Sequence, residues 1–177
     1  MSTFSERLVG AARLDARIFE EIEGDTSATG QAMMAVVLSS IAAGIGTVSV
    51  GGFRVAVLTM GTLIALISWV AWAILTYLIG TRLFPEPQTR ADVGELLRTT
   101  GFASAPGLLR IIGVLPGLGW IVYLVTSIWI LAAMVIGVRQ ALDFTTTGRA
   151  IAVCAAGWIL SLLIAFLVGV SFGPTVQ

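Results

Sequence analysis

The stretch IIGVLPGLGWIVYLVTSIWILAAMVIGV, residues 111–138, contains no Asp, Glu, Lys or Arg in 28 consecutive positions. A helix that crosses a hydrocarbon core of about 30 Å needs roughly 20 predominantly apolar residues. The stretch therefore predicts one membrane-spanning helix, which we place at about Leu118–Val138. Because backbone polar groups in lipid must be bonded within their own segment, a helix is expected rather than a loop.

Three more charge-free runs flank this one, at residues 26–53, 55–81 and 150–177. Each is long enough for one span, and the alternating pattern of a transmembrane barrel strand is absent. We place these spans at about Ala32–Val50, Val55–Ile79 and Ala150–Val170. The predicted fold class is an all-α, polytopic bundle in the membrane with an N-terminal amphipathic helix.

A fifth apolar segment, Phe102–Leu115, is shorter and carries Arg110. Its 14 residues reach only about 21 Å as an α-helix. Either it crosses by starting near Leu96, or it forms a short, kinked or re-entrant helix. Pro106 interrupts its hydrogen-bond ladder, and the pair Pro116-Gly117 is expected to end it.

The distribution of arginine favours five spans over four. With five spans and a cytoplasmic N-terminus, eight arginines lie inside, Arg54 alone lies outside, and Arg110 lies in the membrane. With four spans the ratio is seven to three. The positive-inside rule therefore predicts a cytoplasmic N-terminus and an external C-terminus. We expect a cytoplasmic amphipathic segment at residues 1–30 and a five-span domain at residues 31–177.

The composition narrows the class of protein further. Hydrophobic residues make up 57% of the chain and charged residues 11%, with a mean hydropathy of +0.99 and no net charge, which excludes a soluble domain and a nucleic-acid binder. His is absent and Cys154 is the one cysteine, so we expect no metal, no cofactor and no enzymatic activity. The absence of Lys beside abundant Arg, Ala, Gly and Val suggests a GC-rich prokaryotic genome, and hence the plasma or inner membrane.

Residues 4–23 are predicted to form one amphipathic helix, with a Thr3/Glu6 capping box at its start and Gly24 after its end. This helix either lies in the inner headgroup layer, binds a partner, or packs on the protein's own cytoplasmic loops. A second capping box, Thr89/Asp92, is expected to open a short interfacial helix before the third span.

Arg110 is the strongest single candidate for function, because a charge inside the membrane is costly. The long charge-free runs offer it no carboxylate, so its partners should be carbonyls, hydroxyls such as those of Tyr77 or Tyr123, water or lipid phosphate. Three interpretations remain open: a snorkelling side chain, a site for a lipid headgroup or anionic solute, and a structural clamp on unwound backbone at Pro116. The candidate lipid, solute or structural site comprises Arg110, Pro106, Pro116 and Gly117.

Small residues at helical spacing mark candidate packing surfaces. The pairs Gly113/Gly117 and Gly169/Gly173 fit the G-x-x-x-G pattern of close helix contact. We interpret them as contacts within the chain, with homo-oligomer contact as the alternative. The tryptophans Trp69, Trp72 and Trp129 are interpreted as lipid-facing or packing groups rather than as a ligand cage.

Residues 101–150 resemble the Yip (Ypt-interacting protein) domain family. The resemblance rests on Gly101-Phe102, on Pro106, on the turn at residues 115–119, on Trp129, and on Arg139 followed by a small loop and Arg149-Ala150. The approach Phe19-Glu20-Glu21-Ile22-Glu23 before Gly30-Gln31-Ala32 also looks like prokaryotic members. The resemblance implies five spans and a cytoplasmic N-terminus. Eukaryotic relatives contact prenylated Rab-type GTPases, but the acidic-aromatic segment of those members is absent here.

These observations favour a non-catalytic integral membrane protein that organises or scaffolds other membrane proteins. Two alternatives remain: a small transporter or channel subunit built around Arg110 and the broken third span, and an accessory subunit of a larger membrane complex. The expected partners are membrane lipids and other membrane proteins or a second copy of the chain, and no nucleic acid.

Overall fold

The computed structural model describes the backbone of residues 2–48 and 55–172, and the side chains of residues 2–48 and 55–164. All regular secondary structure in this part of the chain is helical. Within it, four helices are long and apolar enough to cross a membrane. They are α3 (Ala28–Gly46), α5 (Val55–Arg82), α7 (Gly119–Ala141) and α8 (Thr147–Phe172), the last counted over Thr147–Ile164. The all-helical membrane fold is therefore confirmed.

The ends of these helices differ from the predicted spans by about one turn. Helix α3 begins at Ala28 rather than Ala32, because its first turn is set by polar contacts that hydropathy does not report. The Asp25 carboxylate accepts hydrogen bonds from the Ser27 backbone N–H at 3.0 Å and the Ser27 hydroxyl at 2.6 Å. Helix α5 continues to Arg82, three residues past the predicted Ile79.

The third predicted span is divided into two shorter helices, α6 (Val93–Phe102) and the 3₁₀ helix η1 (Ala105–Val114). Pro106 lies in the first turn of η1, where a missing backbone N–H does not break the helix. Neither helix alone is long enough to count as a span, so the four spans among the described residues do not confirm the prediction of five.

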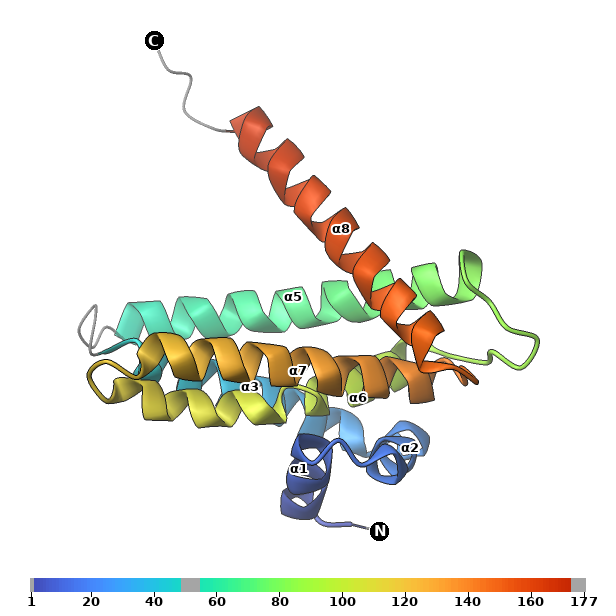
Figure 1. Ribbon diagram of the computed structural model, residues 1–177, viewed down its shortest axis with the longest axis horizontal. Helices are drawn as coiled ribbons and strands as arrows, with labels where there is room; N and C mark the ends of the chain where they lie inside the picture. The colour runs from blue at the N-terminus through green and yellow to red at the C-terminus, as the bar shows by residue number, and fades with distance from the viewer. Residues whose placement is uncertain (1, 49–54, 173–177) are drawn as a thin grey trace.

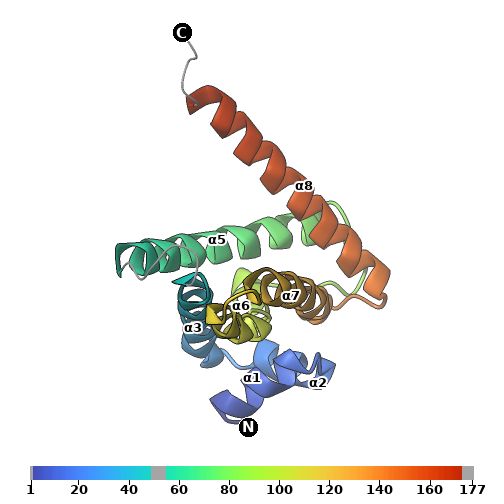
Figure 2. The ribbon, with the colours of Figure 1, turned by 60° about the vertical axis from the view of Figure 1, so that its left-hand side comes forward.

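The long helices form a layered bundle (Figure 1). Helices α3, α7 and the α6–η1 pair lie side by side, with α5 on one side of them and α1 and α2 on the other. Helix α8 begins beside the end of α7, crosses α5 and then points away from the bundle, as the turned view also shows (Figure 2). Its first half therefore contacts the bundle while its second half projects beyond it.

The predicted N-terminal amphipathic helix is wrong as a single element. The structure has two helices, α1 (Phe4–Ala12) and α2 (Ala16–Gly24), separated at Leu14, whose φ is 63°. Asp15, which interrupts the apolar stripe in the sequence, accepts a hydrogen bond from the Arg17 backbone N–H and caps α2. The Thr3/Glu6 capping box at the start of α1 is confirmed.

The second predicted capping box is shifted by three residues. Asp92 is the N-cap of α6 and pairs with Glu95, so Thr89 does not fill that role. The Thr89 hydroxyl instead accepts a hydrogen bond from the Glu86 backbone N–H at 3.0 Å. Both Thr and Asp are good N-caps, and the sequence alone does not choose between the two registers.

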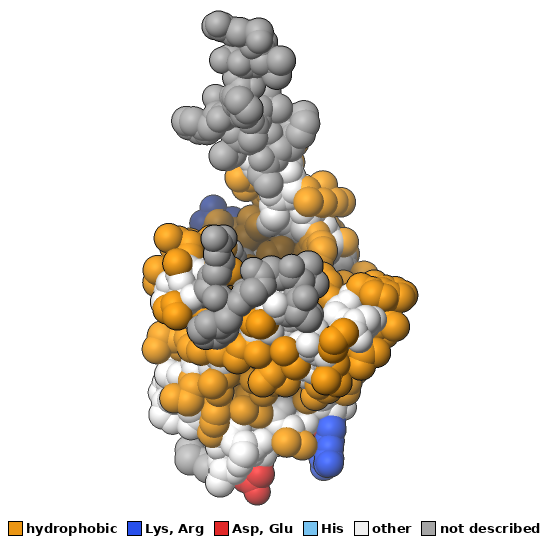
Figure 3. Space-filling view, turned by 90° about the vertical axis from the view of Figure 1, so that its left-hand side faces the viewer, with side chains coloured by type: hydrophobic (Ala, Val, Ile, Leu, Met, Phe, Trp, Pro, Cys, Tyr) orange, Lys and Arg blue, Asp and Glu red, His pale blue; other side chains and the backbone are white. Residues whose placement is uncertain are grey.

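The core is built where small residues let helices approach. Fully buried side chains join α2, α3, α6 and α7 in one cluster, and a second cluster joins α5, α6, α7 and α8. In contrast, large apolar side chains of the long helices remain exposed, and hydrophobic side chains cover much of the middle of the face in Figure 3. The most exposed include Met60, Ile67, Trp120, Ile159 and Leu162. A surface of this kind is stable in lipid rather than in water.

Candidate functional site

Arg110 is held against α7 by three side chains of that helix. Its Nε donates to the Thr126 hydroxyl at 3.1 Å and its Nη2 donates to the Ser127 hydroxyl at 2.9 Å. Its guanidinium carbon lies 4.5 Å from the centroid of the Tyr123 ring, a distance at which a cation and an aromatic face attract each other. Hydroxyl partners were expected for Arg110, with Tyr77 and Tyr123 as examples. The hydroxyls that it contacts belong to Thr126 and Ser127, and Tyr123 contributes its ring.

The other residues of the predicted Arg110 site shape the backbone around it. Pro106 begins η1, and η1 ends at Val114 with Leu115 in an extended conformation before Pro116. Gly117 has a φ of 82°, in the left-handed region that glycine adopts without strain. The turn through Pro116 and Gly117 thus directs the chain from η1 into α7, where the partners of Arg110 lie.

The predicted glycine pairs occupy different surroundings. A β-carbon on Gly113 would lie 3.2 Å from the Gly46 carbonyl oxygen, so η1 and α3 approach closely at this point. A β-carbon on Gly117 would meet nothing within 4 Å, and its role is the turn. Gly169 belongs to α8, whereas Gly173 lies outside the described residues.

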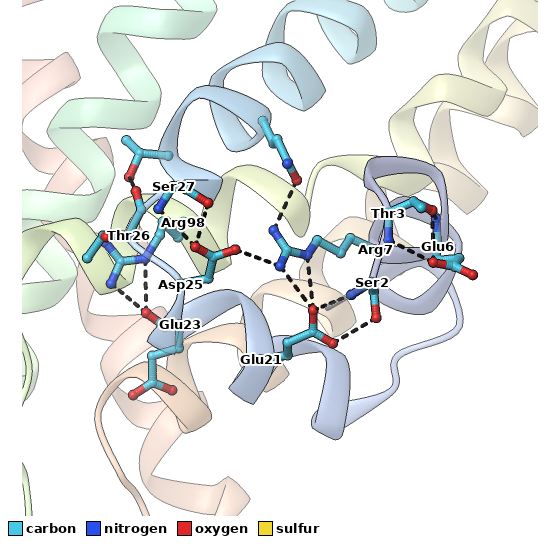
Figure 4. Close-up of polar contacts among 12 residues, drawn as sticks. Ser2, Thr3, Glu6, Arg7, Glu21, Glu23, Asp25, Thr26, Ser27 and Arg98 are labelled. Atoms are coloured by element: carbon cyan, nitrogen blue, oxygen red, sulfur yellow. Dashed lines mark hydrogen bonds and ion pairs between the residues drawn. The ribbon is translucent and has the colours of Figure 1, made fainter.

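A second polar centre, centred on Arg7, was not predicted from the sequence (Figure 4). The Arg7 side chain is buried, and its Nη2 lies 3.0 Å from Glu21 Oε1 and 2.7 Å from Asp25 Oδ2. Its Nη1 donates to the Gln31 side-chain oxygen at 3.1 Å, and the Ser2 backbone N–H donates to Glu21 at 2.8 Å. One guanidinium thus joins α1, α2, the α2–α3 connection and α3.

Further contacts hold the N-terminal helices against the bundle. The Trp129 indole N–H donates to the Ala12 carbonyl oxygen at 2.7 Å, and Arg98 Nε donates to the Glu23 carbonyl oxygen at 3.0 Å. Residue Trp129, interpreted from the sequence as a packing or lipid-facing group, therefore also fixes the end of α1. The N-terminal segment packs on the helices α6, η1 and α7 of its own chain, whereas the expectation named only the cytoplasmic loops.

A third polar centre joins the loops that follow α5 and α7. Glu86 Oε1 lies 2.9 Å from Arg149 Nε, and Glu86 Oε2 accepts a hydrogen bond from the Thr145 backbone N–H at 3.1 Å. Arg149 Nη1 also donates to the Pro85 carbonyl oxygen at 3.1 Å. These contacts fix the start of α8 relative to the end of α5.

Carboxylates around the N-terminal helices have pKa values shifted in opposite directions. Hydrogen bonds from Ser2 and Arg7 lower the pKa of Glu21 to about 2, and hydrogen bonds from Ser27 and Arg7 lower the pKa of Asp25 to about 2. Burial, followed by the nearby carboxylates Asp143, Glu95 and Glu20, raises the pKa of Glu23 to about 7. Arg98 opposes this rise only in part.

We therefore expect stability to fall with rising pH because of Glu23. Its pKa is about 7 in the folded protein and 4.5 ordinarily, so between these values the folded state holds a proton that the unfolded chain releases. The variant Glu23→Gln should lose most of the decline in unfolding midpoint between about pH 5 and pH 8, a window set by these two pKa values. Denaturant titration in detergent at several pH values measures it. The control is Glu6→Gln, because hydrogen bonds from Thr3 lower the pKa of Glu6 and its titration lies below this window.

A profile of the Yip1 domain matches residues 15–169, most of the chain. The chain belongs to the Yip1 domain family. The match covers the long helices as far as Gly169, the α6–η1 pair and all three polar centres apart from Ser2 and Arg7. Among the curated proteins and the solved structures, no match to the chain is found. The family and the apolar helices together identify a membrane protein.

Proposed function

We propose that this Yip1 family protein is a non-catalytic scaffold that binds the transmembrane helices of other membrane proteins. The observation that carries the proposal is the free face of α8. On the bundle side of α8, Val153 and Cys154 are buried, and Gly157 lies against the Trp72 ring. On the opposite side, Ile151 is 54% and Ile159 68% exposed. The small, exposed Ala155 lies between these two residues.

This free face suits a second transmembrane helix better than a water-soluble partner. Ile151, Ala155 and Ile159 are spaced four residues apart, so they form one stripe along α8. Helices associate in lipid by close van der Waals contact at small residues, and Ala155 provides such a point at the centre of the stripe. The second half of α8 projects away from the bundle (Figures 1 and 2), which leaves room for a partner helix beside it.

The proposal includes a five-span topology with a cytoplasmic N-terminus, in the plasma or inner membrane of a prokaryote. Ten residues of α6 reach about 15 Å at 1.5 Å per residue, and ten of η1 reach about 20 Å at 2.0 Å per residue. Together they match a hydrocarbon core of about 30 Å. The arginine distribution and the position of α6–η1 beside α3 and α7 support this third crossing.

The test is isolation of the tagged protein in mild detergent, followed by mass spectrometry of the membrane proteins that stay bound. We expect a stoichiometric partner, and we expect Ala155→Trp to reduce its recovery at least about tenfold by blocking close helix approach. The matched control is Ile64→Trp, a bulky change on the exposed face of α5 that should retain the partner. Equal recovery from both variants, or recovery of only a second copy of the chain, would reject the scaffold proposal.

A further inference from the structure

An open cavity of about 770 Å³ lies between α8 and the helices of the bundle. Its wall is formed by residues of six helices: α3, α5, α6, η1, α7 and α8. The wall is mostly apolar, and Trp69, Trp72 and Trp158 contribute three indole rings to it. Its size is within the range of about 300–1,000 Å³ that sites for small ligands occupy.

Three serine hydroxyls in this wall have no hydrogen-bond partner among the described residues. They belong to Ser39 on α3, Ser68 on α5 and Ser161 on α8. Hydroxyls elsewhere in the apolar helices usually bond to a carbonyl of the preceding turn, as Thr76 does to Trp72 at 2.8 Å and Ser104 to Gly101 at 2.6 Å. Three separate helices thus bring unused hydroxyls to one apolar cavity.

The aromatic part of the wall favours a flat ring. The Trp72 and Trp158 rings have centroids 6.2 Å apart and an interplanar angle of 86°, so they form an aromatic corner. The Trp69 indole N–H donates to the Leu97 carbonyl oxygen at 3.1 Å, whereas the buried Trp72 indole N–H has no partner in the described part of the chain.

The charge of the wall favours a neutral ligand. Within the described residues, no Asp, Glu or Lys lines the cavity. Arg110 also lines it, with its guanidinium held against α7 by Thr126, Ser127 and the Tyr123 ring. A cationic headgroup would therefore lack a counter-charge in the described wall, and an anionic one would meet only Arg110, whose Nε and Nη2 are directed to α7.

The depth of the cavity excludes most of the polar atoms of ordinary phospholipids. Ser68 is the fourteenth of the 28 residues of α5, at the middle of that span, and Ser161 is the fifteenth of the 26 residues of α8. Headgroups and the polar atoms next to them lie at the bilayer surface, outside a hydrocarbon core of about 30 Å. A hydrogen-bond acceptor that reaches hydroxyls near the middle of the bilayer must therefore belong to a largely apolar molecule.

From these observations we propose that the cavity binds a neutral, lipid-soluble ring that carries carbonyl oxygens, the chemistry of an isoprenoid quinone. The ring packs in the corner of Trp72 and Trp158, and the hydroxyls of Ser39, Ser68 and Ser161 donate to its carbonyl oxygens. Its apolar tail leaves along the open side of the cavity, between α5 and α8, into the surrounding lipid. No electron transfer is part of this proposal, and the site is one of binding.

The test uses a decyl-tailed benzoquinone as the probe and the full chain in lipid nanodiscs. We expect saturable quenching of tryptophan fluorescence, because three tryptophans line the cavity. Ser39→Ala combined with Ser161→Ala should weaken binding at least about tenfold, since each lost hydrogen bond to a ligand costs roughly a fivefold change in affinity. The matched control is Ser104→Ala, which lines the same cavity with a hydroxyl already bonded to Gly101 and should bind within about twofold of the wild type.

A second measurement identifies what the protein carries from its own membrane. Lipids extracted from the purified wild-type protein should include a ring-carbonyl lipid that the Ser39→Ala, Ser161→Ala double variant lacks. Far-ultraviolet circular dichroism and gel filtration establish that the double variant is folded. Three results would each overturn the assignment. They are non-saturable quenching by the wild type, unchanged binding by the folded double variant, and enrichment of a glyceride in place of a ring lipid.

Discussion

Replacing Gly101 by leucine should destabilise the bundle more than any other single change considered for this chain. A β-carbon at Gly101 would lie 2.7 Å from the Ala32 β-carbon and 3.0 Å from the Ala32 carbonyl oxygen. The backbone cannot move aside as a flexible side chain can, so α3 and α6 must separate. Overpacking of a buried contact costs about 1–3 kcal/mol, and we expect about 3 kcal/mol here.

The measurement is the unfolding midpoint of purified Gly101→Leu protein in a denaturing-detergent titration followed by circular dichroism. Gly61→Leu is the matched control, since Gly61 lies on α5 with nothing within 4 Å of the added β-carbon. That control should be neutral or slightly more stable, because leucine favours helix over glycine. A Gly101→Leu protein as stable as Gly61→Leu would show that the α3–α6 contact is not close in the membrane.

The second large effect is expected from Arg7→Ala. This change leaves Glu21 and Asp25 without the guanidinium that joins them and removes the contact with Gln31. Removing one partner of a buried ion pair costs about 3–5 kcal/mol, and we expect about 2 kcal/mol because the Glu21 side chain is 32% exposed. The loss should fall on the N-terminal helices, which Arg7 joins to α3.

Limited proteolysis of the folded protein in detergent measures this effect locally. Cleavage between α1 and α3 should be at least about tenfold faster in Arg7→Ala, as a loss of about 2 kcal/mol in local stability implies. The control is Arg17→Ala, whose ion pair with Asp15 involves an 88% exposed arginine and should contribute little. If the two variants are cleaved at the same rate, the Arg7 centre does not hold the N-terminal helices in place.

The membrane helices were predictable because each one lies largely in a long stretch of sequence without charged residues. The apolar runs around Val55–Arg82 and Gly119–Ala141 leave few alternatives to a spanning helix. The break between α1 and α2 was not predicted, since local turn formation at Leu14 competes with a helical periodicity that continues through it. Asp15 carried the signal, as a polar residue in the apolar stripe and a good N-cap.

The polar centres depend on contacts between residues distant in sequence, which a periodic pattern does not encode. Arg7 lies 14 residues from Glu21 and 24 from Gln31. Arg110 was identifiable as an isolated charge, but its partners Thr126 and Ser127 depend on the turn that brings α7 back along η1. Ser39, Ser68 and Ser161 gave no signal, because a serine in an apolar helix usually bonds to its own backbone.

The 3₁₀ geometry of η1 has a mechanical consequence. Ten residues in this form extend about 5 Å further than the same ten residues as an α-helix, at 2.0 against 1.5 Å per residue. Exchange between the two hydrogen-bond patterns breaks no covalent bond, so the reach of this segment is adjustable at a constant number of residues. In the proposed five-span topology, this segment would match a bilayer of different hydrophobic thickness by a change in its own length, whereas the longer helices must tilt.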